Sequence, residues 1–343
     1  MPPWLRSVAL VALMLVLVGI FLRNANLAEV WHVVRTADPL LLASGVACLF
    51  GTYVLRAVRW RVMLAPLGAV SLGYAFRATV IGFAASFVLP ARAGEFIKPW
   101  LVARREGLDP TATFATVVLE RMLDLVAVLL LLGLFLVAFD PGLARLDPAL
   151  FAAVRGGGLA AAGAAVAGMG VLMACASRPD LLQRIVAACT GWLPEKPRAL
   201  VRDLATGFAG GLAVVKDPAR LGLAFAWSVP LWLVIAAQIW LVSRALGVLM
   251  PAAGSLLIMA LLVVGVAVPT PGAVGGFHEA YRIGATALFG ADNDHAVGAA
   301  IVLHAVGFVP TLIVGAWLMA RDGLSFSRLG AEAARAKDEE MHR

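Results

Sequence analysis

The stretch VVLERMLDLVAVLLLLGLFL, at positions 117–136, is an apolar run about as long as the roughly 20 residues that a helix needs to cross a bilayer. Similar runs recur along the 343 residues, of which 62% are hydrophobic and only 14% charged. Soluble domains average roughly 45–50% apolar and about 25% charged residues, and they could not hide this much apolar surface. The composition therefore predicts an all-α, polytopic helical membrane protein.

We expect about six full spans, because six apolar runs are bounded by charge, proline or glycine signals. They cover residues 6–22, 39–55, 113–139, 151–176, 221–246 and 295–320. Loops rich in Lys and Arg stay cytoplasmic, which predicts that both termini are cytoplasmic. Arg56, Arg59 and Arg61 then form a cytoplasmic loop after the second span. Two further stretches, 72–90 and 251–290, begin and end on one side and are expected to form oppositely oriented re-entrant hairpins, a pseudo-inverted repeat.

The chain is expected to be a single transmembrane domain over residues 1–320, followed by a charged cytoplasmic tail at 321–343. Within it, residues 178–220 repeat apolar positions at helical spacing and predict two amphipathic helices at the cytoplasmic surface. The net charge is +7, and the basic residues lie mainly in the short segments between the apolar runs. They form no RNA-reading motif, so no nucleic-acid partner is expected. We expect a multi-pass protein of the bacterial inner membrane.

The segment AASFVLPARAGEFIKPWLVARREG, at positions 84–107, combines helix breaks at Pro90 and Gly94 with the charges of Arg92, Glu95 and Lys98. Broken backbone at membrane depth is tolerated only inside protein or beside a wet cavity. A helix beginning near Gly94 would point free N–H groups and its positive dipole end at an anion such as a lipid phosphate. The plain alternative is that Arg92 and Lys98 only set the topology. A neighbouring indole, that of Trp60, is expected at the headgroup level.

Three charged residues, Glu120, Arg121 and Asp124, lie inside the apolar run at 117–136. Glu120 and Asp124 are four residues apart and share a helix face, while Arg121 is three residues from Asp124 and can bridge to it. Ionised groups at this depth cost about 2.5–3.5 kcal/mol each and usually face a partner or a wet pathway. A purely structural Arg121–Asp124 pair is the alternative, and it leaves Glu120 unexplained.

The segment AVPTPGAVGGFHEAYRIGATALFG, at positions 267–290, repeats these ingredients in a looser form. Its helix-breaking residues are Pro269, Pro271, Gly272, Gly275 and Gly276, and the glycines also allow close approach. The polar residues His278, Glu279 and Arg282 follow. Two segments interrupted by proline and glycine in corresponding halves indicate a transporter binding site near the midplane.

His278 and Glu279 begin a pattern that resembles the H-E-x-x-H zinc motif, but Arg282 stands where the second histidine belongs. We therefore expect no metal site. His278 is a candidate proton relay, and the alternative is a hydrogen-bonded packing histidine, which also applies to His304. With no nucleophile elbow or phosphate-binding loop, the sequence predicts no cofactor and no catalytic residue.

Four segments together resemble the transmembrane, flippase-like family of lysylphosphatidylglycerol synthases, the membrane half of the multiple peptide resistance factor and its stand-alone relatives. They are RAVRWRVMLAPLG (56–68), FVLPARAGEFIKPWLVARREG (87–107), VVLERMLDLV (117–126) and PTPGAVGGFHEA (269–280). The resemblance covers nearly the whole chain. It implies translocation of an aminoacylated phospholipid or another lipid-linked cargo between leaflets. Only the charged tail follows Ala320, so we expect no aminoacyl-transferase activity.

These observations favour a transporter of an anionic phospholipid or polyprenyl-linked lipid. Arg92, Lys98 and Arg282 would engage the headgroup. The carboxylates that would balance charge or carry protons are those of Glu95, Glu120, Asp124 and Glu279. Two alternatives stay open. One is an intramembrane lipid-headgroup enzyme, and the other is a non-catalytic scaffold of a cell-envelope lipid or glycan synthase that docks its partner through 178–220. Whether the chain is a homodimer also stays open.

Overall fold

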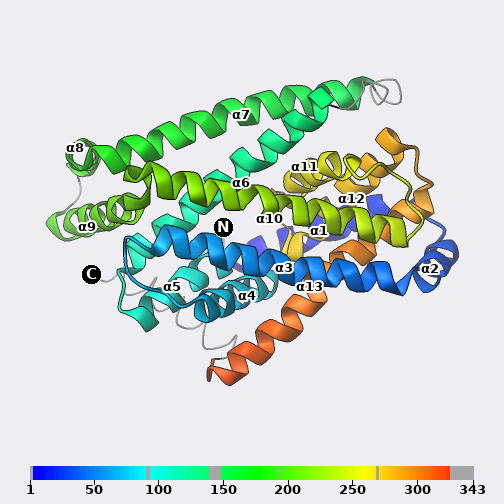
Figure 1. Cartoon of the computed structure of the whole chain (residues 1–343), viewed down its shortest axis with the longest axis horizontal. Coiled ribbons are helices and arrows are strands. Elements are labelled where there is room, and N and C mark those ends of the chain that lie inside the picture. Colours follow the sequence, from blue (N-terminus) through cyan, green and yellow to red (C-terminus); the bar gives the residue numbers. More distant parts are fainter. Residues whose placement is uncertain (1–2, 90–92, 139–147, 193, 268–269, 325–343) are drawn as a thin grey trace. The chain divides into compact units, whose positions relative to one another are not determined.

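The computed structural model describes residues 3–89, 93–138, 148–192, 194–267 and 270–324, and all regular structure within these ranges is helical (Figure 1). The elements are α1 (Pro3–Leu22), α2 (Leu27–Arg35), α3 (Pro39–Leu64), α4 (Leu72–Val88), α5 (Gly94–Glu106), α6 (Pro110–Ala138), α7 (Pro148–Ser177), α8 (Pro179–Thr190), α9 (Glu195–Gly211), η3 (Leu212–Lys216), α10 (Pro218–Ala245), α11 (Gly254–Ala267), η4 (Pro271–Ala273), α12 (Gly276–Ile283), η5 (Gly284–Leu288) and α13 (Asn293–Arg321). The predicted all-α fold class is confirmed.

The chain forms two compact units, each assembled from three stretches of sequence. Unit 1 takes its residues from 1–52, 127–162 and 230–312, and unit 2 takes its residues from 53–126, 163–229 and 313–343. The long helices α3, α6, α7, α10 and α13 contribute residues to both units. The hairpin of α4 and α5 belongs to unit 2, and that of α11 and α12 belongs to unit 1.

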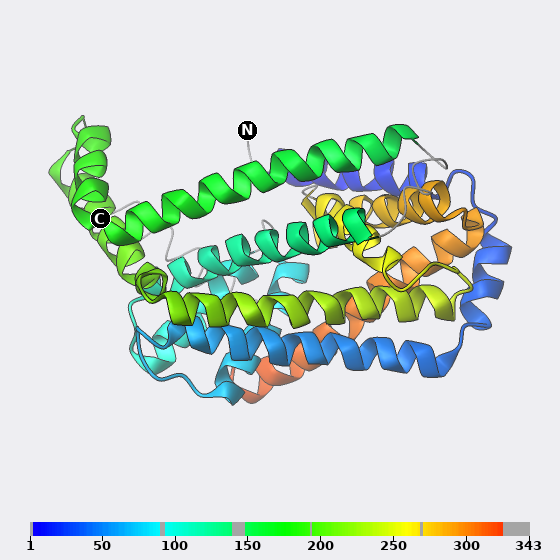
Figure 2. The same cartoon turned by 45° about the horizontal axis from the view of Figure 1, so that its top comes forward.

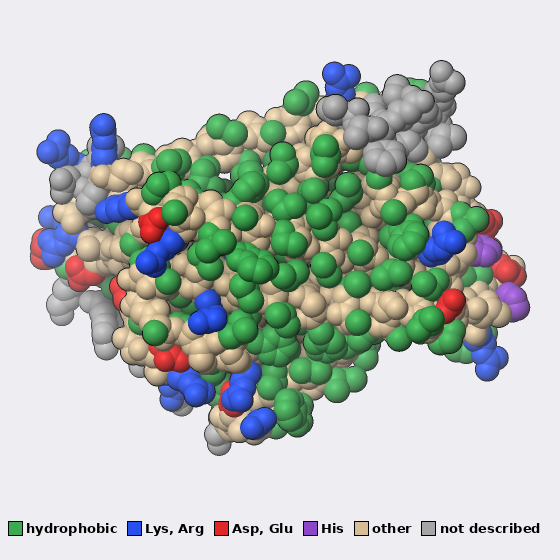
Figure 3. All heavy atoms as spheres, in the orientation of Figure 1, with side chains coloured by type: hydrophobic (Ala, Val, Ile, Leu, Met, Phe, Trp, Pro, Cys, Tyr) green, Lys and Arg blue, Asp and Glu red, His purple; other side chains and the backbone are tan. Residues whose placement is uncertain are grey.

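Each of the six expected spans coincides with a helix, with ends that shift by a few residues, except that α3 is longer at its C-terminal end. Four helical segments in the described part of the chain are long and apolar enough to cross a membrane, and the bent pair α1 and α2 would add a fifth. Figure 3 shows hydrophobic side chains covering much of the visible surface, and exposed examples are Leu40 and Leu249 in unit 1 and Leu223 in unit 2. The chain is a multi-pass membrane protein. The span number and the side of each terminus stay predictions.

The expected cytoplasmic loop after residue 55 is wrong, because α3 continues to Leu64. Arg56 and Arg59 lie within this helix, and their exposed fractions are only 6% and 0%. The positive-inside rule counts basic residues in loops and takes no account of a buried carboxylate that can pair with them. The two arginines therefore belong to the protein interior rather than to a loop that determines orientation.

Helix α2, of nine residues, was not predicted from the sequence. It begins after Asn26, whose side chain accepts hydrogen bonds from the N–H groups of Ala28 and Glu29. This is a standard N-cap, with the acidic Glu29 in the first turn where the helix dipole favours it. The axis of α2 makes an angle of 84° with that of α1. The N-cap pattern is the signal that could have predicted this helix.

Helices α4 and α5 of unit 2 pack against each other as a hairpin (Figure 1). Their contact is closest at Gly82 and Gly94, where a Cβ on Gly94 would overlap the carbonyl oxygen of Gly82. In unit 1, α11 and α12 pack together in the same way, and a Cβ on Gly265 would overlap the carbonyl group of Gly276. Both hairpins therefore require glycine, and in each one the second helix begins at a glycine. That the two hairpins are re-entrant stays a prediction.

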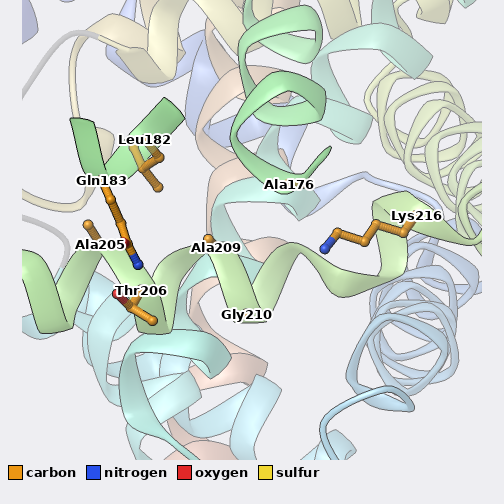
Figure 4. Close-up of a pocket in the computed structure, with 8 residues that line it drawn as sticks. All are labelled: Ala176, Leu182, Gln183, Ala205, Thr206, Ala209, Gly210 and Lys216. Atoms are coloured by element: carbon orange, nitrogen blue, oxygen red, sulfur yellow. The ribbon is translucent and has the colours of Figure 1, made fainter. Parts of the chain in front are cut away.

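The expected amphipathic segment forms α8 and α9, which turn away from the end of α7 in unit 2 (Figure 2). The side chains of Ile185 and Trp192 are exposed on these helices. A cavity of about 220 Å³ lies among α7, α8, α9 and η3 (Figure 4). Its lining residues are Ala176, Leu182, Gln183, Ala205, Thr206, Ala209, Gly210 and Lys216. None of the predicted site residues lines this cavity. The cytoplasmic position of α8 and α9 stays a prediction.

Candidate functional site

Unit 2 contains a network of ionised side chains that we call the charge cluster. Its members are Arg56 and Arg59 on α3, Glu95 and Lys98 on α5, and Glu120, Arg121 and Asp124 on α6. Helix α5 begins at Gly94, as predicted, and this start places Glu95 in its first turn and Lys98 one turn further. Three helices thus bring charged residues that are far apart in sequence into one network.

Glu120 is at the centre of the charge cluster and is fully buried. Its carboxylate accepts hydrogen bonds from Lys98 Nζ at 2.6 Å, from Arg59 at 3.0 Å and from Arg121 at 3.1 Å. A buried carboxylate is tolerated when charge-assisted hydrogen bonds replace the lost water. The three cations explain why α6 can carry Glu120 inside an apolar run.

Asp124 lies one turn further along α6 and is also buried. Arg59 donates to it at 2.6 Å, Arg121 lies 3.4 Å away, and Arg56 lies 3.5 Å away. The predicted bridge between Arg121 and Asp124 is confirmed, but it is one contact among several. Arg59 donates hydrogen bonds to both carboxylates, and it also donates to Ser228 Oγ on α10 at 2.8 Å.

Two neighbouring residues, Trp60 and Gly82, shape the position of Lys98 beside Glu120. Its Nζ lies 4.2 Å from the ring centre of Trp60, within the range of a cation–π interaction. Trp60 is fully buried and donates from its indole N–H to Thr116 Oγ1 at 2.9 Å. The indole of Trp60 therefore packs inside the unit instead of being exposed to lipid, and its position at the headgroup level stays a prediction. A Cβ at Gly82 would press on the Cβ of Lys98, so Gly82 also makes room for this lysine.

The charge cluster has more cations than carboxylates among the residues that the structure describes. Its four cations and three carboxylates leave one positive charge in excess when all are ionised. Glu95 and Arg121 form its accessible edge, with side chains that are 27% and 35% exposed. A buried positive excess with an accessible edge is an arrangement that can bind an anion.

Unit 1 contains a pair of hydrogen-bonded histidines at its hairpin. His278 on α12 accepts at Nδ1 from the N–H of Gly275 at 3.3 Å, and its Nε2 lies 3.1 Å from Nδ1 of His304 on α13. Because Nδ1 of His278 is the acceptor, its Nε2 carries the proton and donates to His304. Phe21 and Phe277 surround the pair. This geometry shows a hydrogen-bonded packing role for His278, and its predicted proton relay is not tested.

Glu279 and Arg282 pair with each other on α12, three residues apart. Arg282 also lies 3.4 Å from the side-chain oxygen of Asn293. Both side chains are mostly buried, at 17% and 18% exposure. The positive charge of Arg282 is therefore balanced locally by Glu279, and the predicted role of Arg282 in binding a headgroup is not tested.

The structure places the predicted residues in two separate constellations. Lys98, Glu120, Arg121 and Asp124 meet in unit 2 with Glu95 at their edge, while His278, Glu279 and Arg282 belong to unit 1. The predicted common cavity of Glu95, Glu120 and Glu279 stays a prediction. Arg92, Pro90 and Pro269 lie outside the described residues.

The remaining predicted backbone breaks lie where the helices of the unit 1 hairpin stop and restart. Pro271 begins the short turn η4, and Gly272 and Gly275 have φ angles of 62° and 93°, which favour glycine. Gly276 then begins α12. The prediction that these residues interrupt the helix is confirmed, whereas a role in binding a substrate is not tested.

Arg56 and Arg59 are the site residues that sequence reasoning missed. They are three residues apart in RAVRWR, and so share a helix face if the second span continues through them. Two carboxylates on one face of an apolar helix require cations of this kind. Matching the two patterns could have predicted the pairing.

Residues 4–315 match the family described as "Lysylphosphatidylglycerol synthase TM region". The chain belongs to this family. The expected family resemblance is confirmed over nearly the whole sequence. A curated relative of this chain is "Glycosyltransferase AglD" of Haloferax volcanii, with 28% identity. The match covers 91% of this chain and 54% of the relative, so the chain spans about half the length of that protein.

Proposed function

We propose that this protein is a flippase-like transporter that moves an anionic phospholipid or a lipid-linked anionic cargo between membrane leaflets. The observation that carries the proposal is the positive excess of the charge cluster, in which Lys98, Arg59, Arg56 and Arg121 face three carboxylates. An anionic headgroup would balance that charge. The exposed hydrophobic side chains of the helices would contact the acyl chains of the same lipid.

A purely structural role for the cluster is less favoured on energetic grounds. Buried ion pairs are weak contributors to stability, because desolvating the charges costs about as much as their attraction returns. A structural network would also be expected to balance its charges, whereas this one has a cation in excess among the described residues and a partly exposed edge. Ionisable groups within a membrane mark substrate or ion pathways in many transporters.

The proposal is tested by leaflet-resolved transport in proteoliposomes that contain the purified full chain. Fluorescent phosphatidylglycerol and a polyprenyl phosphate lipid are supplied in one leaflet, with and without proton and sodium gradients, and the accessible fraction is measured by quenching. The expected result is transfer of at least one of these lipids. Absence of transfer for both lipids under every gradient overturns the proposal.

Lys98→Met is the variant of choice for this assay, because it removes the excess charge and preserves an apolar side chain beside Trp60. Glu120 would still accept from Arg59 and Arg121. Transport should fall by about tenfold or more, since a charge-assisted interaction is worth roughly 1.5–3 kcal/mol. The matched control is Arg77→Gln, which removes a cation that pairs with Asp322 outside the cluster and should leave transport unchanged.

A second candidate function is a membrane scaffold for an enzyme that acts on lipid-linked glycans. The relative named "Glycosyltransferase AglD" favours it, because this chain matches 54% of that protein. Helices α8 and α9, with exposed Ile185 and Trp192, offer a docking surface. Trp192→Ser would then impair glycan transfer in cells and leave lipid transport in proteoliposomes unchanged.

Mass spectrometry of the recovered lipids separates both candidates from an intramembrane enzyme, which would alter its substrate chemically.

A further inference from the structure

Arg121 differs from the other cations of the charge cluster in both exposure and bonding. Its side chain is 35% exposed, whereas those of Arg56, Arg59 and Lys98 are 8%, 0% and 5% exposed. It contacts all three carboxylates, at 3.1 Å for Glu120, 3.4 Å for Asp124 and 3.7 Å for Glu95. Arg121 therefore connects the buried network with its accessible edge.

The network does not need Arg121 to neutralise its buried carboxylates. Without Arg121, Glu120 would still accept from Lys98 and Arg59, and Asp124 would still have Arg59 and Arg56 as partners. Loss of Arg59 would instead remove a 2.6 Å hydrogen bond to Asp124 and a 3.0 Å hydrogen bond to Glu120. Arg121 is thus a partly exposed cation that can turn towards a ligand without leaving an unpaired buried charge.

The contact between Arg121 and Glu95 is incomplete. The Glu95 carboxylate lies 3.7 Å from Nε of Arg121, which is too far for a hydrogen bond. This Nε is buried and has no hydrogen-bond partner among the residues that the structure describes. Buried donors without partners are uncommon and each requires an explanation. An oxyanion closer than Glu95 would satisfy the donor, and guanidinium groups bind phosphate through two parallel hydrogen bonds.

Glu95 also lies in the first turn of α5, where the helix dipole attracts negative charge. We propose that Glu95 is an internal substitute for a phosphate-type oxyanion, and that Arg121 exchanges Glu95 for this anion when the ligand binds. The inference rests on the proposed function in treating the cluster as the cargo site. It adds the residue that contacts the anion and the carboxylate that competes with it. The anion can be a lipid phosphodiester or free phosphate.

Binding to the purified full chain in detergent tests the exchange. The probes are dihexanoyl-phosphatidylglycerol and inorganic phosphate, with dihexanoyl-phosphatidylcholine as a zwitterionic comparison, each titrated by calorimetry. Arg121→Gln should weaken phosphatidylglycerol binding by about tenfold or more. Glu95→Gln should tighten it by roughly threefold to tenfold, because the competing negative charge is gone. The double variant should bind like Arg121→Gln alone, since Glu95 acts only through Arg121.

The matched control is Glu106→Gln on the same helix, which pairs with Arg105 outside the cluster and should leave binding unchanged. Thermal unfolding of each variant shows that it is folded, and Arg121→Lys serves as the milder variant, because it keeps the charge and loses the planar fork. An affinity of Glu95→Gln equal to or lower than that of the wild type overturns the exchange. Wild-type affinity in Arg121→Gln overturns it as well.

The two probes and the transport assay separate this inference from the proposed function. Binding of phosphatidylglycerol that responds to both variants supports the exchange with a lipid source of the anion. The same responses with inorganic phosphate alone support the exchange and count against lipid as the cargo. Lipid transfer that persists in Arg121→Gln, together with unchanged binding, overturns the exchange and leaves the transporter proposal standing.

Discussion

The two hairpins of this protein share a backbone design and differ in their chemistry. The α4–α5 hairpin of unit 2 and the α11–α12 hairpin of unit 1 each bring two helices into contact at a pair of glycines, Gly82 with Gly94 and Gly265 with Gly276. The first hairpin supplies Lys98 and Glu95 to the charge cluster. The second supplies His278 to a neutral histidine pair. A common backbone contact thus supports two different sets of side chains.

The difference lies in where the partners of each polar group come from. Lys98 on α5 depends on Glu120 on α6, and Glu120 in turn depends on Arg59 on α3. Glu279 and Arg282 instead pair within one turn of α12. The first hairpin is therefore coupled electrostatically to the helices around it, whereas the charges of the second are balanced on its own helix. Under the proposed function, the anionic cargo therefore binds at the first hairpin.

The largest effect is expected at Arg59, because both buried carboxylates depend on it. Arg59→Met should lower the free energy of unfolding by about 3–5 kcal/mol, the usual cost of removing one partner from a buried ion pair. Chemical unfolding in detergent micelles would measure this loss. A loss below about 1 kcal/mol would show that Glu120 and Asp124 are held by the other cations alone.

Substitutions at the two glycine contacts should have the next largest effect on stability, and this effect should be similar in the two hairpins. Gly94→Ala and Gly265→Ala each place a methyl group against a backbone carbonyl, so each should cost about 1–3 kcal/mol or more of stability. Gly73→Ala on α4 is the control, because a Cβ there has no atom within 4 Å. Thermal unfolding of the three variants compares them directly. Stability equal to that of Gly73→Ala would refute the shared contact.

The histidine pair should have a smaller effect. His304→Phe removes the acceptor of His278 Nε2 and keeps an aromatic ring near Phe277 and Phe308. The loss of one hydrogen bond should cost about 0.5–1.5 kcal/mol. His295→Gln, at the half-buried start of α13, is the control for removal of a histidine. A change of several kcal/mol would mean that the pair holds the hairpin more firmly than one hydrogen bond can.

The smallest effect is expected at Glu279, whose pairing is confined to α12. Glu279→Gln removes the charge and keeps a hydrogen-bond acceptor for Arg282, so stability should change by about 1 kcal/mol or less. Binding of dihexanoyl-phosphatidylglycerol should also remain within about twofold of the wild type, because a twofold change is below 0.5 kcal/mol. A tenfold change in that affinity would contradict the contrast between the hairpins and assign Arg282 to the binding site.

Local patterns in the sequence predicted the long helices and the interruptions of the two hairpins. Apolar runs marked α1, α3, α6, α7, α10 and α13, and Gly94 and Gly276 marked the starts of α5 and α12. These features depend on residues that are close in sequence, since helix periodicity and backbone freedom are local properties. The Arg121–Asp124 contact was predictable for the same reason, because three residues separate its partners on one helix.

The partners of Glu120 were decided by the tertiary structure. Lys98 is 22 residues away and Arg59 is 61 residues away, and the positive-inside rule placed Arg56 and Arg59 in a loop, whereas α3 buries them. An ion pair forms between whichever groups packing brings within a few ångströms, and this selection depends on side-chain distance rather than on sequence spacing. Sequence thus determined that buried charges exist on α6, whereas the packing of α3, α5 and α6 determined which cations balance them and left Arg121 at the edge.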